Sequence, residues 1–156
     1  MLEEVLSADA PELRGMLNRY LAELAAFQVA SERASGEYSY FEVYWSEPGR
    51  YPFFIVENGR HVGFVLIRGP ESTGDEFFEV AEFFVEPQSR CSGVGERTVR
   101  EIWDRFPGAW RLQTYRGNGA AVRFWSTCMK AKGVRDIATK ERMDGDQPVV
   151  KFSFLV

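Results

Sequence analysis

Cysteine, histidine and long apolar runs are scarce in this chain of 156 residues. Its two cysteines, Cys91 and Cys128, are too few for a disulfide framework or a four-thiolate zinc site. The single histidine, His61, argues against a histidine-rich metal site. No apolar run is long enough for a membrane-spanning helix, and the acidic start lacks the features of a signal peptide. We therefore expect a cytoplasmic protein with no membrane partner and no metal.

An excess of basic residues is also missing. Lys and Arg number 19 against 23 Asp and Glu, a net charge of −4, which argues against a nucleic-acid-binding surface. With 45% apolar residues, the chain is long enough to bury a core of its own, so we expect one domain over 1–156. Aromatic residues reach 15%. This content predicts a phenylalanine-rich core or, alternatively, an aromatic-lined ligand pocket.

Apolar residues at helical spacing predict an N-terminal helix over 9–35. Asp9 followed by Glu12 resembles a capping box, and the pair Ser35-Gly36 is a plausible stop. The aromatic stretch 38–45 has extended propensity. We expect it to pack under the helix or to form one wall of a ligand pocket.

Three strands are predicted in quick succession, over 52–56, 61–68 and 77–85. Asn58-Gly59 is a hairpin signal, and the connections are too short for parallel crossovers, so these strands should form an antiparallel meander. The periodicity beyond them predicts helices over about 95–106 and 119–132 and strands over 110–115, 134–139 and 149–156. The sum is an α+β domain with a mixed sheet flanked by helices.

The loop over 88–95 links a buried strand to a helix. The first amides of a helix lack partners within it, the helix dipole is positive there, and glycine permits close approach of a ligand. Gly93 and Gly95 with Arg90 therefore suit a phosphate or pyrophosphate group. A tight turn without a ligand would use the same glycines.

Two other phosphate-binding motifs fail on the residues themselves. A Walker loop ends in Gly-Lys-Ser/Thr, whereas Gly95 is followed by Glu96 and Arg97. A dinucleotide fingerprint needs a third glycine or alanine within a parallel sheet, whereas residue 98 is Thr98 and the preceding strands are antiparallel.

Two motifs resemble the GNAT superfamily of acyl-CoA-dependent N-acyltransferases. Its motif A, Arg/Gln-x-x-Gly-x-Gly/Ala after a strand ending in Val-x-Pro, matches residues 90–95 after 85–87. Its second signature, Asn-x-x-Ala-x-x-Phe-Tyr, matches residues 118–125, except that Trp125 replaces the tyrosine. The resemblance covers about 50–155 and implies the GNAT fold, in which the sheet opens as a V between the strands near Val85 and Trp110.

The resemblance also implies a binding site for acetyl-CoA as co-substrate. Loop amides would cradle its pyrophosphate, strand backbone would pair with its pantetheine arm, the amide near Phe84 would polarise the thioester carbonyl, and the second helix would flank the arm. The residues so implied are Phe83, Phe84, Val85, Arg90, Cys91, Ser92, Gly93, Val94, Gly95, Asn118, Ala121 and Phe124.

Two carboxylates are candidates for accepting the proton of an amine. Glu79 and Glu82 align with acidic positions of GNAT members, and their odd separation predicts opposite faces of the strand. Either could instead be a solvated surface carboxylate. The family often uses a tyrosine as general acid where Trp125 stands, and an indole cannot give up a proton in that role. Tyr115 is the substitute candidate, unless it is simply a core residue.

The predicted function is acetyl transfer from acetyl-CoA to the primary amine of a small molecule or peptide, by direct attack. The alternative is a GNAT-like module that binds acyl-CoA as a sensor or interaction partner with little catalysis, which Trp125 favours. The sequence leaves monomer and homodimer open.

Overall fold

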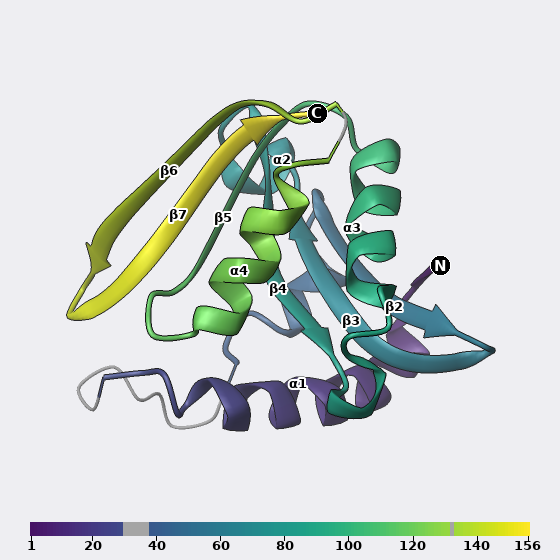
Figure 1. Cartoon of the computed structure of the whole chain (residues 1–156). Helices are drawn as coiled ribbons and strands as arrows, with labels where there is room; N and C mark the ends of the chain where they lie inside the picture. Colours follow the sequence, from purple (N-terminus) through teal and green to yellow (C-terminus); the bar gives the residue numbers. More distant parts are fainter. Residues whose placement is uncertain (30–37, 132) are drawn as a thin grey trace.

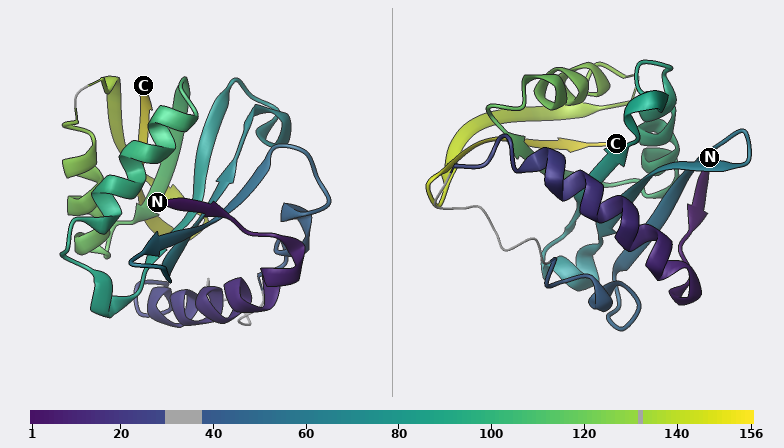
Figure 2. Two further views of the ribbon diagram at one scale, coloured as in Figure 1. Left: turned by 90° about the vertical axis from the view of Figure 1, so that its right-hand side faces the viewer. Right: turned by 90° about the horizontal axis from the view of Figure 1, so that it is seen from below.

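A seven-stranded sheet organises the computed structural model, which describes residues 1–29, 38–131 and 133–156. The strand order is β1-β2-β3-β4-β5-β7-β6, and helices flank both faces (Figures 1 and 2), so the predicted mixed α+β architecture is confirmed. The strands are β1 Leu2–Glu4, β2 Arg50–Glu57, β3 Arg60–Arg68, β4 Phe77–Val85, β5 Ala109–Tyr115, β6 Arg135–Asp144 and β7 Gln147–Leu155. The helices are α1 Ala10–Leu24, α2 Pro70–Thr73, α3 Val94–Arg105 and α4 Gly119–Cys128.

The predicted meander of β2, β3 and β4 is present, with antiparallel pairing throughout. Asn58 and Gly59 both have positive φ, 52° and 72°, as a tight hairpin turn requires. β4 then pairs in parallel with β5, but only from Phe77 to Val80. Beyond that point the two strands separate, and we call the gap between them the V. The sheet therefore opens where the sequence predicted.

The two faces of the sheet bury separate cores. α3 and α4 lie on one face, where their apolar sides pack on alternate residues of β4, β5 and β7, such as Val80, Trp110 and Phe152. α1 packs on the other face, against residues of β2 to β4 such as Phe64 and Phe84. α1 covers only that first half of the sheet, and it crosses near the end of β4 (Figure 1). The V thus opens between α1 on one side and α3 with α4 on the other.

A β-bulge in β4 changes which side chains share a face. Leu66 pairs with Glu82 and Ile67 with Val80, so Ala81 has no partner in β3. The extra residue shifts the alternation of side chains by one position. Val80 therefore points toward α3 and α4, while Glu82 points toward α1. The prediction that Glu79 and Glu82 lie on opposite faces is therefore wrong, since both project on the α1 side.

The N-terminal part differs most from expectation. α1 ends at Leu24, and the predicted stop at residues 35–36 lies outside the described residues. Asp9 makes no side-chain cap, since Glu12 instead binds His61 at 2.7 Å. The stretch 38–45 is not extended but turns through a 3-10 helix, Glu42–Tyr44, that buries Phe41 and Tyr44 under α1.

Three further differences lie at element ends. Strand β1 was not predicted and pairs with β2 at the sheet edge. The loop over 69–76 contains the single turn α2. The last two strands form a longer hairpin than expected, turning only at Gly145-Asp146, because ladder pairing continues to Asp144 and Gln147. Within the described ranges, no helix is both long and apolar enough to cross a membrane.

Candidate active site

A cavity of about 410 Å³ lies at the V, between α1 and the start of α3. It draws its lining from α1, the end of β4, the loop after it, α3 and α4. All predicted cofactor-binding residues line this cavity except Ser92, whose hydroxyl binds the Ser89 carbonyl instead at 2.8 Å. Residues that the two motifs place far apart in the sequence therefore surround one space.

The loop before α3 presents a run of free backbone donors. Gly93 and Cys91 both adopt positive φ, 79° and 59°, which turns successive amides toward the same side. Within the described chain, the backbone N–H groups of residues 91–96 have no acceptor, and the first bond of the helix runs from Arg97 to the Gly93 carbonyl. Such donors at a helix N-terminus form an anion site.

Helix α4 closes the opposite wall of the cavity. Asn118 caps this helix, because its side-chain oxygen accepts from the Ala121 amide at 3.1 Å. Phe124 packs against Phe83 of β4, with ring centroids 5.5 Å apart. A Cβ on Gly95 would lie 3.0 Å from the Phe124 ring, so glycine is needed for this close approach. The second glycine of the loop thus joins the two motifs physically.

At the edge of β4 that faces the V, every second residue presents its backbone N–H and C=O groups. Phe84 pairs with Phe64, and the Glu86 backbone N–H donates to the Val62 carbonyl. The ladder therefore directs the backbone N–H and C=O of Phe84 toward β3. By the same alternation the backbone N–H and C=O groups of Phe83 and Val85 face the V. Of the amides near Phe84 that we expected to polarise the thioester carbonyl, those of Phe83 and Val85 therefore face the V.

Both arginines of the loop region are already engaged. Arg90 donates from Nε to the Val85 carbonyl at 2.7 Å and pairs with Glu23 of α1 at 2.8 Å. Arg97 donates to the Ser92 carbonyl at 3.1 Å and pairs with Glu57. These contacts hold the loop against β4 and α1. They also mean that an entering anion would compete with carboxylates for both cations.

The α1 side of β4 carries a half-buried acid, Glu82, which is not among the residues that line the cavity. Burial raises the pKa of Glu82 to about 7, although hydrogen bonds from Tyr20 and Tyr38 lower it, and the nearby charge of Glu79 raises it further. Burial and the Glu82 charge also raise the pKa values of both tyrosines, so both keep their protons. Tyr20 lines the cavity as well. Glu82 is therefore a carboxyl that changes its charge near neutral pH.

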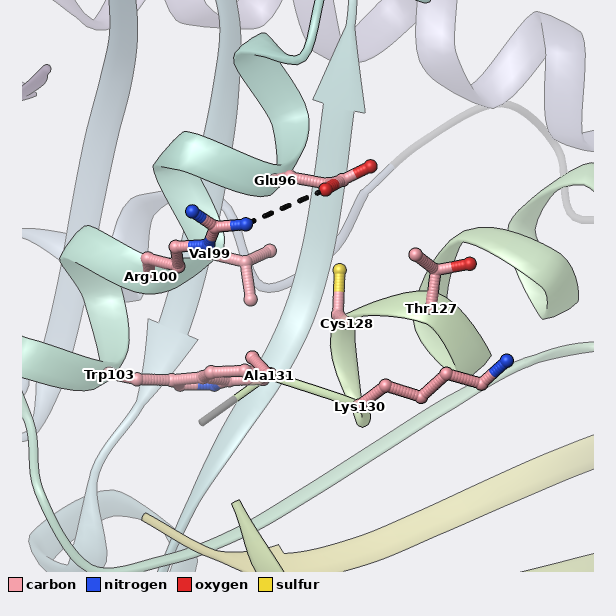
Figure 3. Close-up of a pocket in the computed structure, with 8 residues that line it drawn as sticks. All are labelled: Glu96, Val99, Arg100, Trp103, Thr127, Cys128, Lys130 and Ala131. Atoms are coloured by element: carbon pink, nitrogen blue, oxygen red, sulfur yellow. Dashed lines mark ion pairs between the residues drawn. The ribbon is translucent and has the colours of Figure 1, made fainter. Parts of the chain in front are cut away.

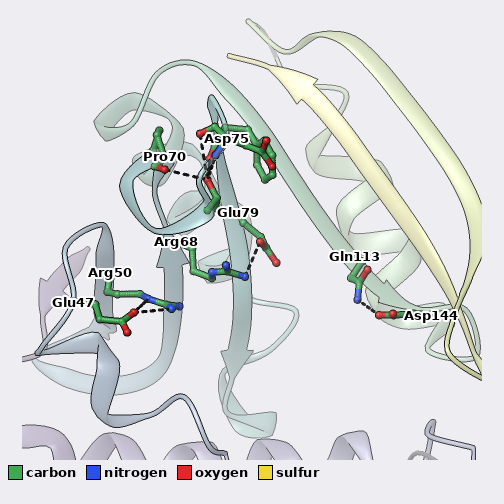
Figure 4. A network of polar contacts seen from close by, with 10 residues as sticks. Glu47, Arg50, Arg68, Pro70, Asp75, Glu79, Gln113 and Asp144 are labelled. Carbon is green, nitrogen blue, oxygen red and sulfur yellow. Dashed lines mark hydrogen bonds and ion pairs between the residues drawn. The ribbon is translucent and has the colours of Figure 1, made fainter.

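The other two predicted catalytic residues lie on the same side but have their own partners. Glu79 pairs with Arg68 at 3.2 Å (Figure 4). The Tyr115 hydroxyl, at the end of β5, accepts a hydrogen bond from Gln28 at 2.9 Å and lies close enough to Tyr20 to affect its pKa. Tyr115 is not among the residues that line the cavity.

A smaller cavity of about 160 Å³ lies between the outer sides of α3 and α4 (Figure 3). Its wall contains an ion pair between Glu96 and Arg100 at 3.8 Å, and Cys128 points toward it. Cys128 is buried, and burial raises its thiol pKa to about 12, so it stays protonated.

Sequence reasoning missed the contribution of α1 to the site. Tyr20, Glu23, Leu24 and Phe27 line the cavity, and Tyr38 reaches Glu82 from the following segment. Their spacing along the helix was visible, but it indicates only an apolar face. No local signal shows that this face ends over the V rather than in the core.

The splayed mixed sheet and its loop of free amides define an acyltransferase fold. The sequence profile described as "Acetyltransferase (GNAT) family" matches residues 17–129, and the chain belongs to this family. Curated proteins yield no significant sequence match.

Solved structures with the same fold share little sequence with this chain. A spermidine N-acetyltransferase from Vibrio cholerae, in complex with CoA and spermine, is 15% identical, with a TM-score of 0.66 over 99% of this chain and 94% of that one. A ribosomal-protein-alanine N-acetyltransferase from Brucella melitensis is 16% identical, with a TM-score of 0.65 over 100% and 99%. A GNAT acetyltransferase from Streptococcus pneumoniae is 16% identical, with a TM-score of 0.68 over 100% and 99%.

Proposed function

We propose that the chain transfers an acetyl group from acetyl-CoA to a primary amine by direct attack. The observation that carries the proposal is the pairing of two features at one gap in the sheet. On one side, the amides of residues 91–96 lack acceptors in the described structure. On the other, Glu82 has a pKa of about 7. Acetyl-CoA would supply the acetyl group as an activated thioester.

Each wall of the V would have its own task. The amides of residues 91–96 would bind the pyrophosphate, and the free backbone groups of Phe83 and Val85 would orient the pantetheine arm as an added strand would. One of these amides would also donate to the thioester oxygen as negative charge develops there. For Val85 the carbonyl would first have to leave Arg90, which binds it at 2.7 Å.

Glu82 would act as the general base. It would take one proton from the ammonium group, and the free amine would then form the C–N bond as the C–S bond breaks. A base with a pKa near the working pH suits this transfer. The nitrogen would lose its second proton to solvent as the amide forms. The CoA thiolate would leave with the electron pair of the broken bond, and Tyr115 remains the candidate to protonate it. Much of the rate would come from holding the two reactants together.

The second candidate is a module that binds acyl-CoA without turnover. Two observations favour it: Trp125 lines the cavity where the family often places a tyrosine, and Glu23 holds Arg90 across that cavity. Both functions require the ligand, and only the first releases free thiol.

Two measurements test the proposal. Acetyl-CoA at millimolar concentration should raise the melting temperature, because a ligand that binds only the folded state stabilises it. Thiol release from acetyl-CoA should then rise when primary amines are added. Stabilisation without thiol release across a broad amine panel would favour the binding module, and no stabilisation would contradict both functions.

A further inference from the structure

Among the described residues, no helix packs on one face of the second half of the sheet. α3 and α4 cover one side of β5 and β7, where Leu112 and Phe152 are buried. The alternate residues point to the opposite side, where α1 and the residues just after it contact only the end near Tyr115 and Gln147. A cavity of about 390 Å³ lies there. Its lining includes four cations, which we call the basic face, and one carboxylate, Glu79. The basic face consists of Arg111, Lys140, Arg142 and Lys151.

The register places these cations in rows across the strands. Lys140 of β6 lies directly opposite Lys151 of β7, and Lys151 is in turn opposite Gln113 of β5. In the adjacent row Arg111 lies between Glu79 and Ser153. Like charges directly opposite each other in a sheet are destabilising. This face of the sheet therefore contains an unfavourable contact between Lys140 and Lys151.

Carboxylates do not neutralise the basic face. No residue in the described part of the chain forms an ion pair with Lys140, Lys151 or Arg142. Arg111 instead lies over the Phe77 ring, 3.8 Å from its centroid. Asp144 is engaged by Gln113 at 2.8 Å (Figure 4). In a chain with a net charge of −4, this cavity thus brings together four cations, and Lys140, Lys151 and Arg142 among them have no ion pair in the described structure.

The basic face adjoins the proposed reaction site. Glu79 lines the cavity and also contributes to the raised pKa of Glu82, and both carboxylates project on the α1 side of the sheet. A ligand that extends along this side of the sheet from Glu82 toward β6 would pass Glu79 first and the cations farther along. Figure 4 shows Glu79 and Gln113 on the two strands that border this path.

We propose that the acceptor is a small amine that carries an anionic group, carboxylate or phosphate. This inference rests on the proposed acetyl transfer. The amine lies beside Glu82, and the anionic group lies among Lys140, Lys151 and Arg111. A polycationic amine meets four like charges at the same place and binds poorly. The unfavourable lysine pair is relieved when the anion binds.

Binding of matched amines to the complex with CoA tests the proposal without turnover. One pair is 4-aminobutanoate and 4-aminobutanamide, and the other is 2-aminoethyl phosphate and ethanolamine. We expect each anionic amine to bind about 10-fold more tightly than its neutral partner at low salt, with the difference shrinking at high salt. The two pairs distinguish carboxylate from phosphate. Spermidine should bind most weakly.

Two variants locate the effect. Lys140→Gln and Lys151→Gln should each reduce the preference for the anionic amine by about two- to five-fold and leave binding of the neutral partner unchanged. Neither should lower the melting temperature, because each removes a like-charge contact. Lys130→Gln is the matched control, since Lys130 is an exposed lysine beyond the end of α4, on the other side of the sheet.

Equal affinities within both pairs, no binding of either anionic amine, or an unchanged preference in both variants would overturn the inference. Its failure is separate from that of the acetyl transfer. Anion preference without thiol release from acetyl-CoA would contradict only the transfer, whereas thiol release from neutral amines without anion preference would contradict only the basic face as an acceptor site.

Discussion

The two walls of the V are built in different ways. The wall at α3 is made of backbone: free amides over 91–96, two positive φ angles and a glycine against an aromatic ring. The wall at α1 is made of side chains: Glu82 with Tyr20 and Tyr38. Backbone donors keep their charge distribution at every pH. The side-chain wall changes its charge near pH 7 because of Glu82.

This difference separates binding from chemistry. A backbone site suits a ligand group that stays the same throughout the reaction, such as a pyrophosphate. A titrating carboxyl suits a step in which a proton moves. Substitutions on one wall should therefore change affinity for acetyl-CoA, and substitutions on the other should change turnover. The following predictions test that division.

The largest effect is expected for Glu82→Gln. The variant keeps the shape and loses the base, so kcat should fall by about 10²–10⁴-fold while the Kd for acetyl-CoA stays within about three-fold. In the unmodified chain kcat/KM should rise with pH up to about pH 7 and then level off, because Glu82 must be ionised. Steady-state kinetics across pH 5–9 measures both. The same pH dependence of kcat/KM in the variant as in the unmodified chain would show that the base lies elsewhere.

Gly93→Val should have the next largest effect, on the other wall. Valine is strained at φ 79°, so the loop must move and redirect its amides. The Kd for acetyl-CoA should rise by about 10–100-fold, as measured by calorimetry. Gly117→Val is the matched control, because Gly117 has open space and no positive φ. Unchanged affinity in Gly93→Val would remove the loop from the binding site.

The backbone wall could be predicted from sequence and the side-chain wall only in part. Arg90, Gly93 and Gly95 lie within six residues of one another, and Asn118 acts on Ala121 only three residues on, so local spacing specifies both the loop and the cap. The environment of Glu82 depends on contacts with α1 and on Tyr38, far away in the chain. The bulge at Ala81 also escapes period-two counting, which is why the prediction of opposite faces for Glu79 and Glu82 was wrong.

Stability should also depend on Glu82, with the opposite sign to activity. Its pKa is near 7 in the folded chain and about 4.5 when unfolded, so the folded state binds the extra proton between these values. The free energy of unfolding should therefore fall as pH rises from about 4.5 to 7. Glu82→Gln should raise the free energy of unfolding by about 1–3 kcal/mol at pH 8 and leave it unchanged near pH 4. Urea unfolding at the two pH values measures this, and a gain at both would point to better packing instead.

The smallest effect is expected for Glu79→Gln, which shares a face with Glu82 but differs in environment. Arg68 already holds the Glu79 carboxylate at 3.2 Å, and both side chains are about one third exposed. Because this carboxylate is already engaged by a cation rather than free to face the amine, kcat should fall by less than about five-fold. Loss of the Glu79 charge should also lower the pKa of Glu82, because that charge is one of the causes that raise it. The rising limb of the pH profile should therefore move to lower pH. A kcat loss as large as that of Glu82→Gln, with an unmoved profile, would instead make Glu79 the base and assign the tyrosine-bound carboxyl a structural role.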